Sequence, residues 1–278
     1  MEHKYQHIIP EVHLRRWEAP NLGPGRNGQI WVIQKDDLTK KLPRSPKSVF
    51  GKENHYTIWK GSERDLSVEK GLGKIETELP KVHAKLAARK PITGPERMIL
   101  TEFASSMLSR VESQSNWMAE HLSEVWYQTA RLEEQEHIDP IASSNIEKEM
   151  LNRNGGFVRA AFPLRARMLL GMRLAILTTD DHIGFITGDD PCSMHVRDGW
   201  RVHIGNPTVE IIIPLTPHHA ALFMGPPDLA RLCSPGTYYR ISTGLLDECN
   251  RRTMTQCQKE FVSLSGDVRD SWFVPATA

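Results

Sequence analysis

The stretch from Val68 to Leu86 reads VEKGLGKIETELPKVHAKL, and its apolar residues recur at intervals of four, three, four, three and four positions. These intervals place them on one face of an α-helix, whose period is about 3.6 residues. The face consists of Val68, Leu72, Ile75, Leu79, Val82 and Leu86. We predict a helix from about Asp65, with a kink or break at Pro80, because an internal proline removes a hydrogen bond and clashes with the preceding turn.

Three further helices are predicted after this stretch. Gly94-Pro95 restarts the chain, and a second apolar stripe runs from Leu100 to about Leu132. A third helix covers Asn145–Asn152 and ends at the glycine pair 155–156, and a fourth begins near Phe157. The helical pattern therefore extends to about residue 171.

Strand-like segments lie on both sides of this helical block. Ile30–Gln34 is short, β-branched and aromatic, which is typical of a strand. After Met172, the segments "RLAILTT" and "IGFITG" flank residues 180–182 and predict a hairpin. The segments "RVHIG", "VEIIIPL" and "HAALFMG" predict further strands, and a helix from Leu245 to about Lys259 precedes the strand "FVSLS".

Helices followed by strands predict an α+β fold, because alternating βαβ units are absent from the pattern. We expect a mixed, mainly antiparallel β body, residues 1–61 and 172–278, with an inserted helical lobe at about 62–171. A length of 278 residues suits one domain spanning 1–278.

The composition limits the classes of partner. Hydrophobic residues make up 39% and charged residues 25%, with a net charge of +1 and a pI of about 7.8. Such a chain has no global positive field, so a nucleic-acid partner would need a local basic patch. No apolar run is as long as a membrane span, so we expect no membrane association. The four cysteines lack a CxxC spacing and predict reduced thiols in a cytoplasmic protein, with disulfides as the alternative.

The segment "HIIPEVHLRRW", residues 7–17, gathers polar residues with catalytic capability. His7 and His13 could move protons near neutral pH, and Arg15 and Arg16 could bind phosphate through a planar fork. The alternative is a surface segment whose apolar side chains pack on the core while the charges face water.

The segment "ITGDDP", residues 186–191, places two carboxylates at the end of an apolar run. Adjacent carboxylates can hold a divalent metal or act as a base. Neighbouring strand residues point to opposite faces, however, and Asp189 and Asp190 between glycine and proline also suit a turn. Asn250, on the last predicted helix, could hydrogen-bond a strand end, either to organise a site or to satisfy the backbone.

Metal-binding patterns are weak. Glu210 has no lysine two residues later, which disfavours the two-strand arrangement of metal nucleases. His195, His203, His218 and His219 lack zinc-ligand spacing, and the pair 218–219 predicts a turn between two strands. We expect no metal ligands and name no cofactor, although a divalent metal stays compatible with the sequence.

Together these segments resemble the bacterial family catalogued as domain of unknown function 4238. The opening segment matches the family motif at His7, Pro10, Leu14 and Arg15, with an aromatic residue at Trp17. "ITGDDP" resembles its Ile-Thr-Ser-Asp-Asn-Pro motif at Ile186, Thr187, Asp189 and Pro191. "MLSRVE" resembles a helix segment with an arginine at Arg110, and Asn250 resembles an asparagine on the final helix.

The resemblance implies candidate residues but no activity. Because Asp190 replaces an asparagine, it implies one candidate carboxylate, Asp189, and not a pair. One hypothesis is a hydrolase of phosphodiesters such as RNA. In it His7 is the general acid or base, Arg15 and Arg110 hold a phosphate, Asp189 orients the histidine, and Asn250 contributes to binding. The other is a non-enzymatic binding or regulatory protein with a protein partner, as in bacterial stress or phage defence, in which the same residues form a structural network.

Overall fold

The computed structural model describes residues 5–20, 22, 28–117, 120, 124, 140–196, 204–225 and 238–273. Within 140–150, only the backbone and the Lys148 side chain are described. The chain begins with short strands and one helical turn. These are β1 (Tyr5–His7), α1 (Glu11–Leu14), β2 (Ile30–Gln34), β3 (Lys41–Arg44), β4 (Gly51–Glu53), β5 (Ile58–Lys60) and β6 (Glu63–Asp65).

Three long helices follow: α2 (Ser67–Ala87), α3 (Gly94–Arg110) and α5 (Pro140–Gly171). Helix α2 buries all six apolar positions that the sequence placed on one face. The predicted break at Pro80 is wrong, because α2 continues through it. A proline inside a helix costs about 3 kcal/mol, whereas burying one large aliphatic side chain stabilises by about 1.5–3 kcal/mol. Leu79, Val82 and Leu86 next to the proline are fully buried.

Helix α3 begins with a capping box between Thr93 and Glu96 and ends at Arg110, because Val111 has an extended backbone with ψ 156°. The predicted stripe to about Leu132 therefore breaks at residue 111. Residues 112–117 form a further helical turn, and most of 118–132 lies outside the described residues.

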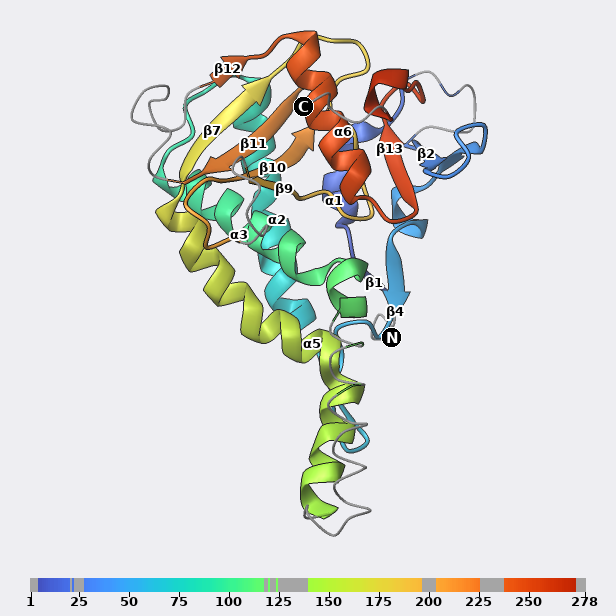
Figure 1. The fold of residues 1–278 in the computed structure, drawn as a ribbon, viewed down its shortest axis with the longest axis vertical. Helices are drawn as coiled ribbons and strands as arrows, with labels where there is room; N and C mark the ends of the chain where they lie inside the picture. The colour runs from blue at the N-terminus through green and yellow to red at the C-terminus, as the bar shows by residue number, and fades with distance from the viewer. Residues whose placement is uncertain are drawn as a thin grey trace.

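Helix α5 replaces the two separate helices expected around residues 145–171. It runs unbroken across the glycine pair 155–156. A Cβ at Gly155 would lie 2.7 Å from the carbonyl oxygen of Tyr56. This glycine therefore permits close packing between α5 and the segment before β5, and does not end the helix. The N-terminal half of α5 projects away from the sheets (Figure 1).

The rest of the chain forms most of the sheet structure. It contains β7 (Arg173–Thr178), β8 (Thr187–Gly188), β9 (Ser193–Val196), β10 (Val209–Thr216), β11 (His219–Met224), β12 (Tyr238–Arg240), α6 (Thr243–Gln256) and β13 (Glu260–Ser263). One sheet has the order β12-β7-β11-β10-β9 and is antiparallel except for the β12–β7 pair. A second has the antiparallel order β3-β2-β13-β8. The fold is α+β, as predicted.

The strands at 30–34, 209–216 and 219–224 confirm their predictions, and the last helix ends a turn earlier than expected. The predicted strand "RVHIG" lies partly outside the described residues, and 204–205 form a turn. The predicted hairpin around 180–182 is wrong, because β7 and β8 belong to different sheets. The Asp181 carboxylate accepts the amide of Ile183 at 3.0 Å, and this turn directs the chain from one sheet to the other.

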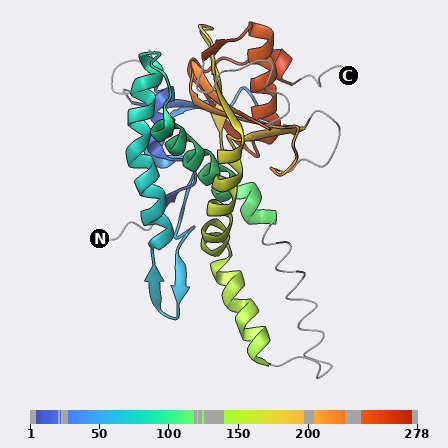
Figure 2. The same ribbon diagram turned by 90° about the vertical axis from the view of Figure 1, so that its left-hand side faces the viewer.

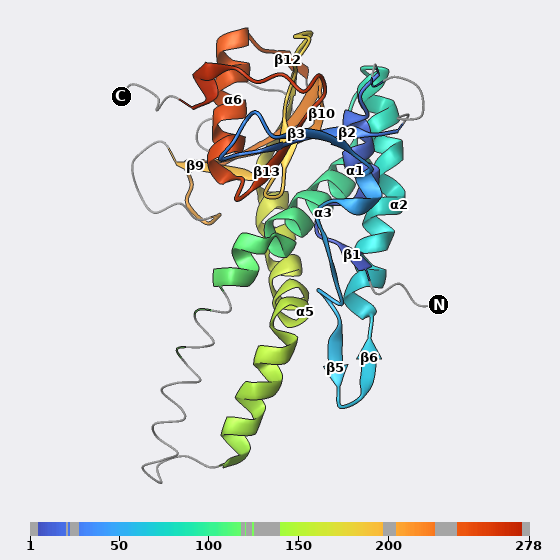
Figure 3. The ribbon, with the colours of Figure 1, turned by 90° about the vertical axis from the view of Figure 1, so that its right-hand side faces the viewer.

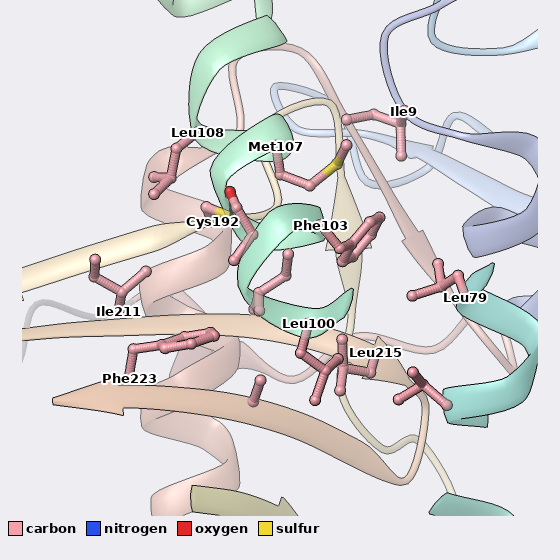
Figure 4. Packing of buried hydrophobic residues seen from close by; sticks show 14 of the residues in the cluster. Ile9, Leu79, Leu100, Phe103, Met107, Leu108, Cys192, Ile211, Leu215 and Phe223 are labelled. Atoms are coloured by element: carbon pink, nitrogen blue, oxygen red, sulfur yellow. Dashed lines mark hydrogen bonds between the residues drawn. The ribbon is translucent and has the colours of Figure 1, made fainter. Parts of the chain in front are cut away.

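The five-stranded sheet lies between helices. Ile211, Ile213 and Phe223 share one buried cluster with α3, as Figure 4 shows for its labelled side chains. Ile212 and Ala220, which alternate with them, pack against α6 in a separate cluster. Figures 2 and 3 show the same arrangement from two sides, with α2 and α3 on one side of the sheet and α6 on the other. Successive residues of β10 and β11 point to opposite faces of the sheet, and both faces are covered by helices. This explains why these two strands are almost entirely apolar.

Candidate functional site

Arg15 is an exposed residue with local partners. Its Nε donates to Glu11 Oε1 at 2.9 Å, and its Nη1 donates to Glu18 Oε1 at 2.7 Å. These acids lie four residues before and three residues after it, so both pairs form on one helical surface. None of the bonds of Arg15 within the described chain reaches another predicted site residue.

Asp189 and Asn250 are bound to backbone. The Asp189 carboxylate accepts the amides of Gln258 at 2.8 Å, Lys259 at 2.7 Å and Glu260 at 3.1 Å, which holds the start of β13. The buried Asn250 accepts the amide of Ile186 at 3.1 Å and donates to the carbonyl of Gly184 at 2.9 Å. The geometry gives both side chains structural partners and does not place Asp189 against His7.

Asp190 is buried and separate from Asp189. Its Oδ2 accepts from Ser113 Oγ at 2.6 Å and from Gln256 Nε2 at 3.0 Å, so it joins the turn after α3 to the end of α6. Burial raises the pKa of Asp190 to about 6. Within the part of the chain that the structure describes, no group of three or more His, Cys, Asp or Glu side chains is arranged to hold a metal ion.

His7 and Arg110 do lie near each other, together with Glu76 of α2. Arg110 is 2% exposed, and its Nη1 donates to Glu76 Oε1 at 2.8 Å. Its Nε and Nη2 have no hydrogen-bond partner among the residues that the structure describes. His7 Nε2 donates to the carbonyl of Lys47 at 3.2 Å, and burial lowers the pKa of His7.

The two motif segments also hold the turn between β10 and β11. Trp17 Nε1 donates to the carbonyl of Phe185 at 2.8 Å, and the amide of Phe185 donates to the carbonyl of Pro217 at 2.7 Å. Gly184 has a φ of +69°, and a Cβ there would lie 2.1 Å from the Pro217 oxygen. Glycine is needed at this position both for the backbone conformation and for the close approach. The sequence predicts a turn between the two strands at residues 218–219; the structure has it at 217–218, and His219 is the first residue of β11.

This turn forms one wall of an open pocket of about 630 Å³, here called the histidine pocket. The other walls come from the 3₁₀ turn η1 (Arg15–Trp17), the end of α2, the end of β7 and the segment after β13. The lining residues are Arg16, His83, Ala87, Arg89, Thr179, Asp180, Thr216, Pro217, His218, His219 and Leu264.

His83 is the unusual member of the histidine pocket. It is 3% exposed, and neither ring nitrogen has a hydrogen-bond partner in the part of the chain that the structure describes. Burial lowers its pKa to about 3, and the charges of Arg16 and His219 act in the same direction. The imidazole is therefore neutral at neutral pH. A buried polar group without a partner costs free energy, on the order of 1–3 kcal/mol, so a site of this kind calls for an explanation.

His219 faces the same pocket with its orientation fixed. Thr216 Oγ1 accepts the amide of His218 at 3.1 Å and lies 2.9 Å from His219 Nδ1. This arrangement lets the hydroxyl donate to Nδ1, which leaves the proton of the neutral ring on Nε2. Burial lowers the pKa of His219 to about 4, with His218 and Arg89 contributing.

Arg16 and Arg89 supply positive charge to the histidine pocket. Arg16 is exposed and forms no hydrogen bond or ion pair within the described residues. Arg89 Nη2 lies 3.2 Å from Asp180 Oδ1, and Arg240 Nη2 lies 2.9 Å from Asp180 Oδ2. Guanidinium groups of this kind bind phosphate well.

Arg16 and the pair at 218–219 stand out in the sequence, but no sequence pattern connects them with His83. His83 directly follows Val82, a residue of the apolar face of α2, so its burial could have been anticipated. Its lack of a partner could not, because that depends on four segments distant in sequence.

The comparisons with known proteins give a family and no activity. The model of the family described as "Protein of unknown function (DUF4238)" matches residues 5–267. The chain belongs to this family. No curated protein and no solved structure matches it. Among the described residues of this DUF4238 member, no helix is long and apolar enough to cross a membrane. The three described cysteines, Cys192, Cys249 and Cys257, are free and buried.

Proposed function

We propose that this protein hydrolyses phosphodiesters, such as those of RNA, in the histidine pocket. The observation that carries the proposal is His83, which lines an open pocket and whose buried ring nitrogens have no hydrogen-bond partner among the described residues. A neutral imidazole needs one donor and one acceptor, and a substrate hydroxyl or an attacking water can provide both.

The chemistry divides between two histidines and two arginines. His83 acts as the general base that takes the proton of the attacking hydroxyl. Arg16 and Arg89 bind the phosphate oxygens and stabilise the charge that grows on them. His219, in its protonated form, gives the proton on Nε2 to the leaving oxygen and returns to the neutral ring.

The low pKa values of the two histidines suit this division once substrate is present. Both rings lose their charge chiefly through burial. A phosphate within a few ångströms favours the protonated form and raises both pKa values. Binding of the negative substrate would therefore favour protonation of the two histidines. Because one histidine must be neutral and the other protonated, the rate of cleavage should rise and then fall with pH.

The test is hydrolysis of a short RNA and of bis(4-nitrophenyl) phosphate, with and without magnesium. We expect His83→Asn to lower kcat by roughly 100-fold or more, as is usual for loss of an acid–base group. His195→Asn is the matched control, because His195 lies on β9, opposite Glu210 at the end of β10 away from the pocket. Full activity in His83→Asn would contradict the proposal.

The set predicted from sequence stays an alternative location for the same activity. His7 and Arg110 are close, and two Arg110 nitrogens have no partner within the described chain. His7→Ala separates the two locations in the same assay. A large loss in His7→Ala with none in His83→Asn would favour the sequence-based assignment.

A non-enzymatic binding or regulatory protein is the second candidate. The backbone bonds of Asp189 and Asn250 favour it, since they suit a network that stiffens the fold. It predicts phosphate binding in the histidine pocket without turnover of either substrate.

A further inference from the structure

Asp180 lies in the wall of the histidine pocket, between two arginines from different elements. Its two carboxylate oxygens are shared, one with Arg89 at 3.2 Å and one with Arg240 at 2.9 Å. Arg89 follows the end of α2, and Arg240 is the last residue of β12. The Asp180 carboxylate therefore forms an ion pair with Arg89, at the position where a bound anion would pair with this arginine.

The contacts of Asp180 can be exchanged for others. The side chains of Arg89, Asp180 and Arg240 are 66%, 51% and 76% exposed, so solvent and solutes reach all three. Exposed ion pairs contribute little to stability, typically about 0–1 kcal/mol each. A phosphate, with more charge and three acceptor oxygens, is a stronger partner for a guanidinium than a carboxylate is.

The backbone around these arginines is fixed, so such an exchange needs only side-chain rotation. Arg89 has a φ of +48° and its amide donates to the carbonyl of Leu86 at 3.0 Å. The Tyr238 hydroxyl donates to the carbonyl of Lys90 at 2.7 Å, which ties β12 to the end of α2. A ligand can therefore bind both arginines without moving their backbone.

We propose that Asp180 is an intramolecular competitor for phosphate, which holds Arg89 and Arg240 until a ligand displaces it. This inference rests on the proposed function, because it concerns the same pocket. It implies a preference for ligands that bring two or more negative charges, such as neighbouring phosphates of a nucleic-acid strand. A ligand with a single carboxylate would only replace like with like.

The experiment is calorimetric titration of the whole protein with inorganic phosphate at low salt. We expect Asp180→Asn to bind phosphate roughly two- to tenfold more tightly, as loss of two exposed ion pairs allows. The gain should shrink as sodium chloride is added, because salt screens exposed charges. Acetate is the second probe, and wild type should bind it more weakly than phosphate.

Asp36→Asn is the matched control, because it changes the net charge equally. Asp36 is exposed and follows Gln34, which pairs with Glu260 at the end of β2 away from Leu264. It should leave phosphate affinity unchanged. Equal tightening in Asp36→Asn would show a general charge effect and would overturn the inference.

The remaining outcomes separate the two proposals. If Arg16→Gln and His83→Asn weaken phosphate binding but Asp180→Asn weakens it or leaves it unchanged, Asp180 positions the arginines and only this inference fails. If phosphate binds to neither wild type nor Asp180→Asn, both proposals fail.

Discussion

The family motif residues and the histidine pocket are two polar regions that differ in hydrogen bonding. Asp189 accepts three backbone amides, Asn250 makes two backbone bonds and Trp17 makes one. His83 is also buried, but within the described residues its ring makes no hydrogen bond. Satisfied buried groups specify a fold, whereas an unsatisfied one costs stability and needs another reason to be there.

The two regions are physically connected. Asn250 holds Ile186 and Gly184, and Phe185 between them holds the carbonyl of Pro217 in the pocket wall. The motif therefore serves as the support of the pocket. In this account, changes to the motif lower stability, and changes to the pocket lower function with little or no cost in stability.

The largest effect on stability is expected for Asn250→Ala. It leaves a buried amide and a buried carbonyl without partners, which costs about 2–4 kcal/mol in the free energy of unfolding. Urea unfolding measures it. Gln258→Ala is the control, because its side chain is exposed and should change stability by less than about 0.5 kcal/mol. Equal effects in both variants would remove the distinction between motif and surface.

The next effect concerns Asp190 and depends on pH. Burial raises the pKa of Asp190 to about 6, so the folded state holds a proton more tightly than the unfolded state does. Its contribution to stability is present below the unfolded pKa of about 4 and is lost as the pH rises through about 6. An asparagine at this position does not ionise, so Asp190→Asn should not lose stability in this way. Between about pH 4 and pH 7, its free energy of unfolding should rise relative to that of wild type by on the order of 1–3 kcal/mol.

Unfolding of wild type and Asp190→Asn across this pH range measures the difference. Parallel curves would show that Asp190 ionises in the folded state without cost, contrary to its burial between Ser113 and Gln256.

His83→Leu should have the opposite sign from Asn250→Ala. It removes an unpaired buried polar group and puts an apolar side chain of similar size in its place. We expect stability to rise by about 1–2 kcal/mol, while hydrolysis or phosphate binding is lost. A fall of the same size as in Asn250→Ala would mean that His83 is a structural residue.

The smallest effect is expected for Arg15→Gln. Its pairs with Glu11 and Glu18 are exposed, so stability should change by less than about 1 kcal/mol. Activity should not change, because no bond of Arg15 to another described residue reaches the histidine pocket. A strong loss of activity in Arg15→Gln would instead support a catalytic role for the opening motif, residues 7–17.

Local patterns in the sequence predicted the features that depend on residues close together in the chain. The apolar face of α2, the strands β10 and β11 and the turn between them depend on periods of about 3.6 and 2 residues. The surface pairing of Arg15 was also available, since Glu11 and Glu18 lie at helical spacing from it. The same logic failed at Gly155, where a helix-ending residue permits contact with Tyr56 instead.

The features that the sequence did not predict depend on contacts between residues far apart in the chain. The segment after β7 looks like half of a hairpin, but β8 joins β13, more than 70 residues later in the chain. The histidine pocket likewise combines α2, η1 and the turn at 216–219 with the end of β7. No spacing within one segment reports that His83 lacks a partner, so the sequence placed the site at His7 and Asp189.

The most direct measurement is a nuclear magnetic resonance titration of the histidine side-chain nitrogens with inorganic phosphate. We expect saturable shifts for the ring nitrogens of His83 and His219, with those of His7 unchanged. Saturable shifts at His7 with none at His83 would contradict this expectation and would place the site at the Arg110 cluster.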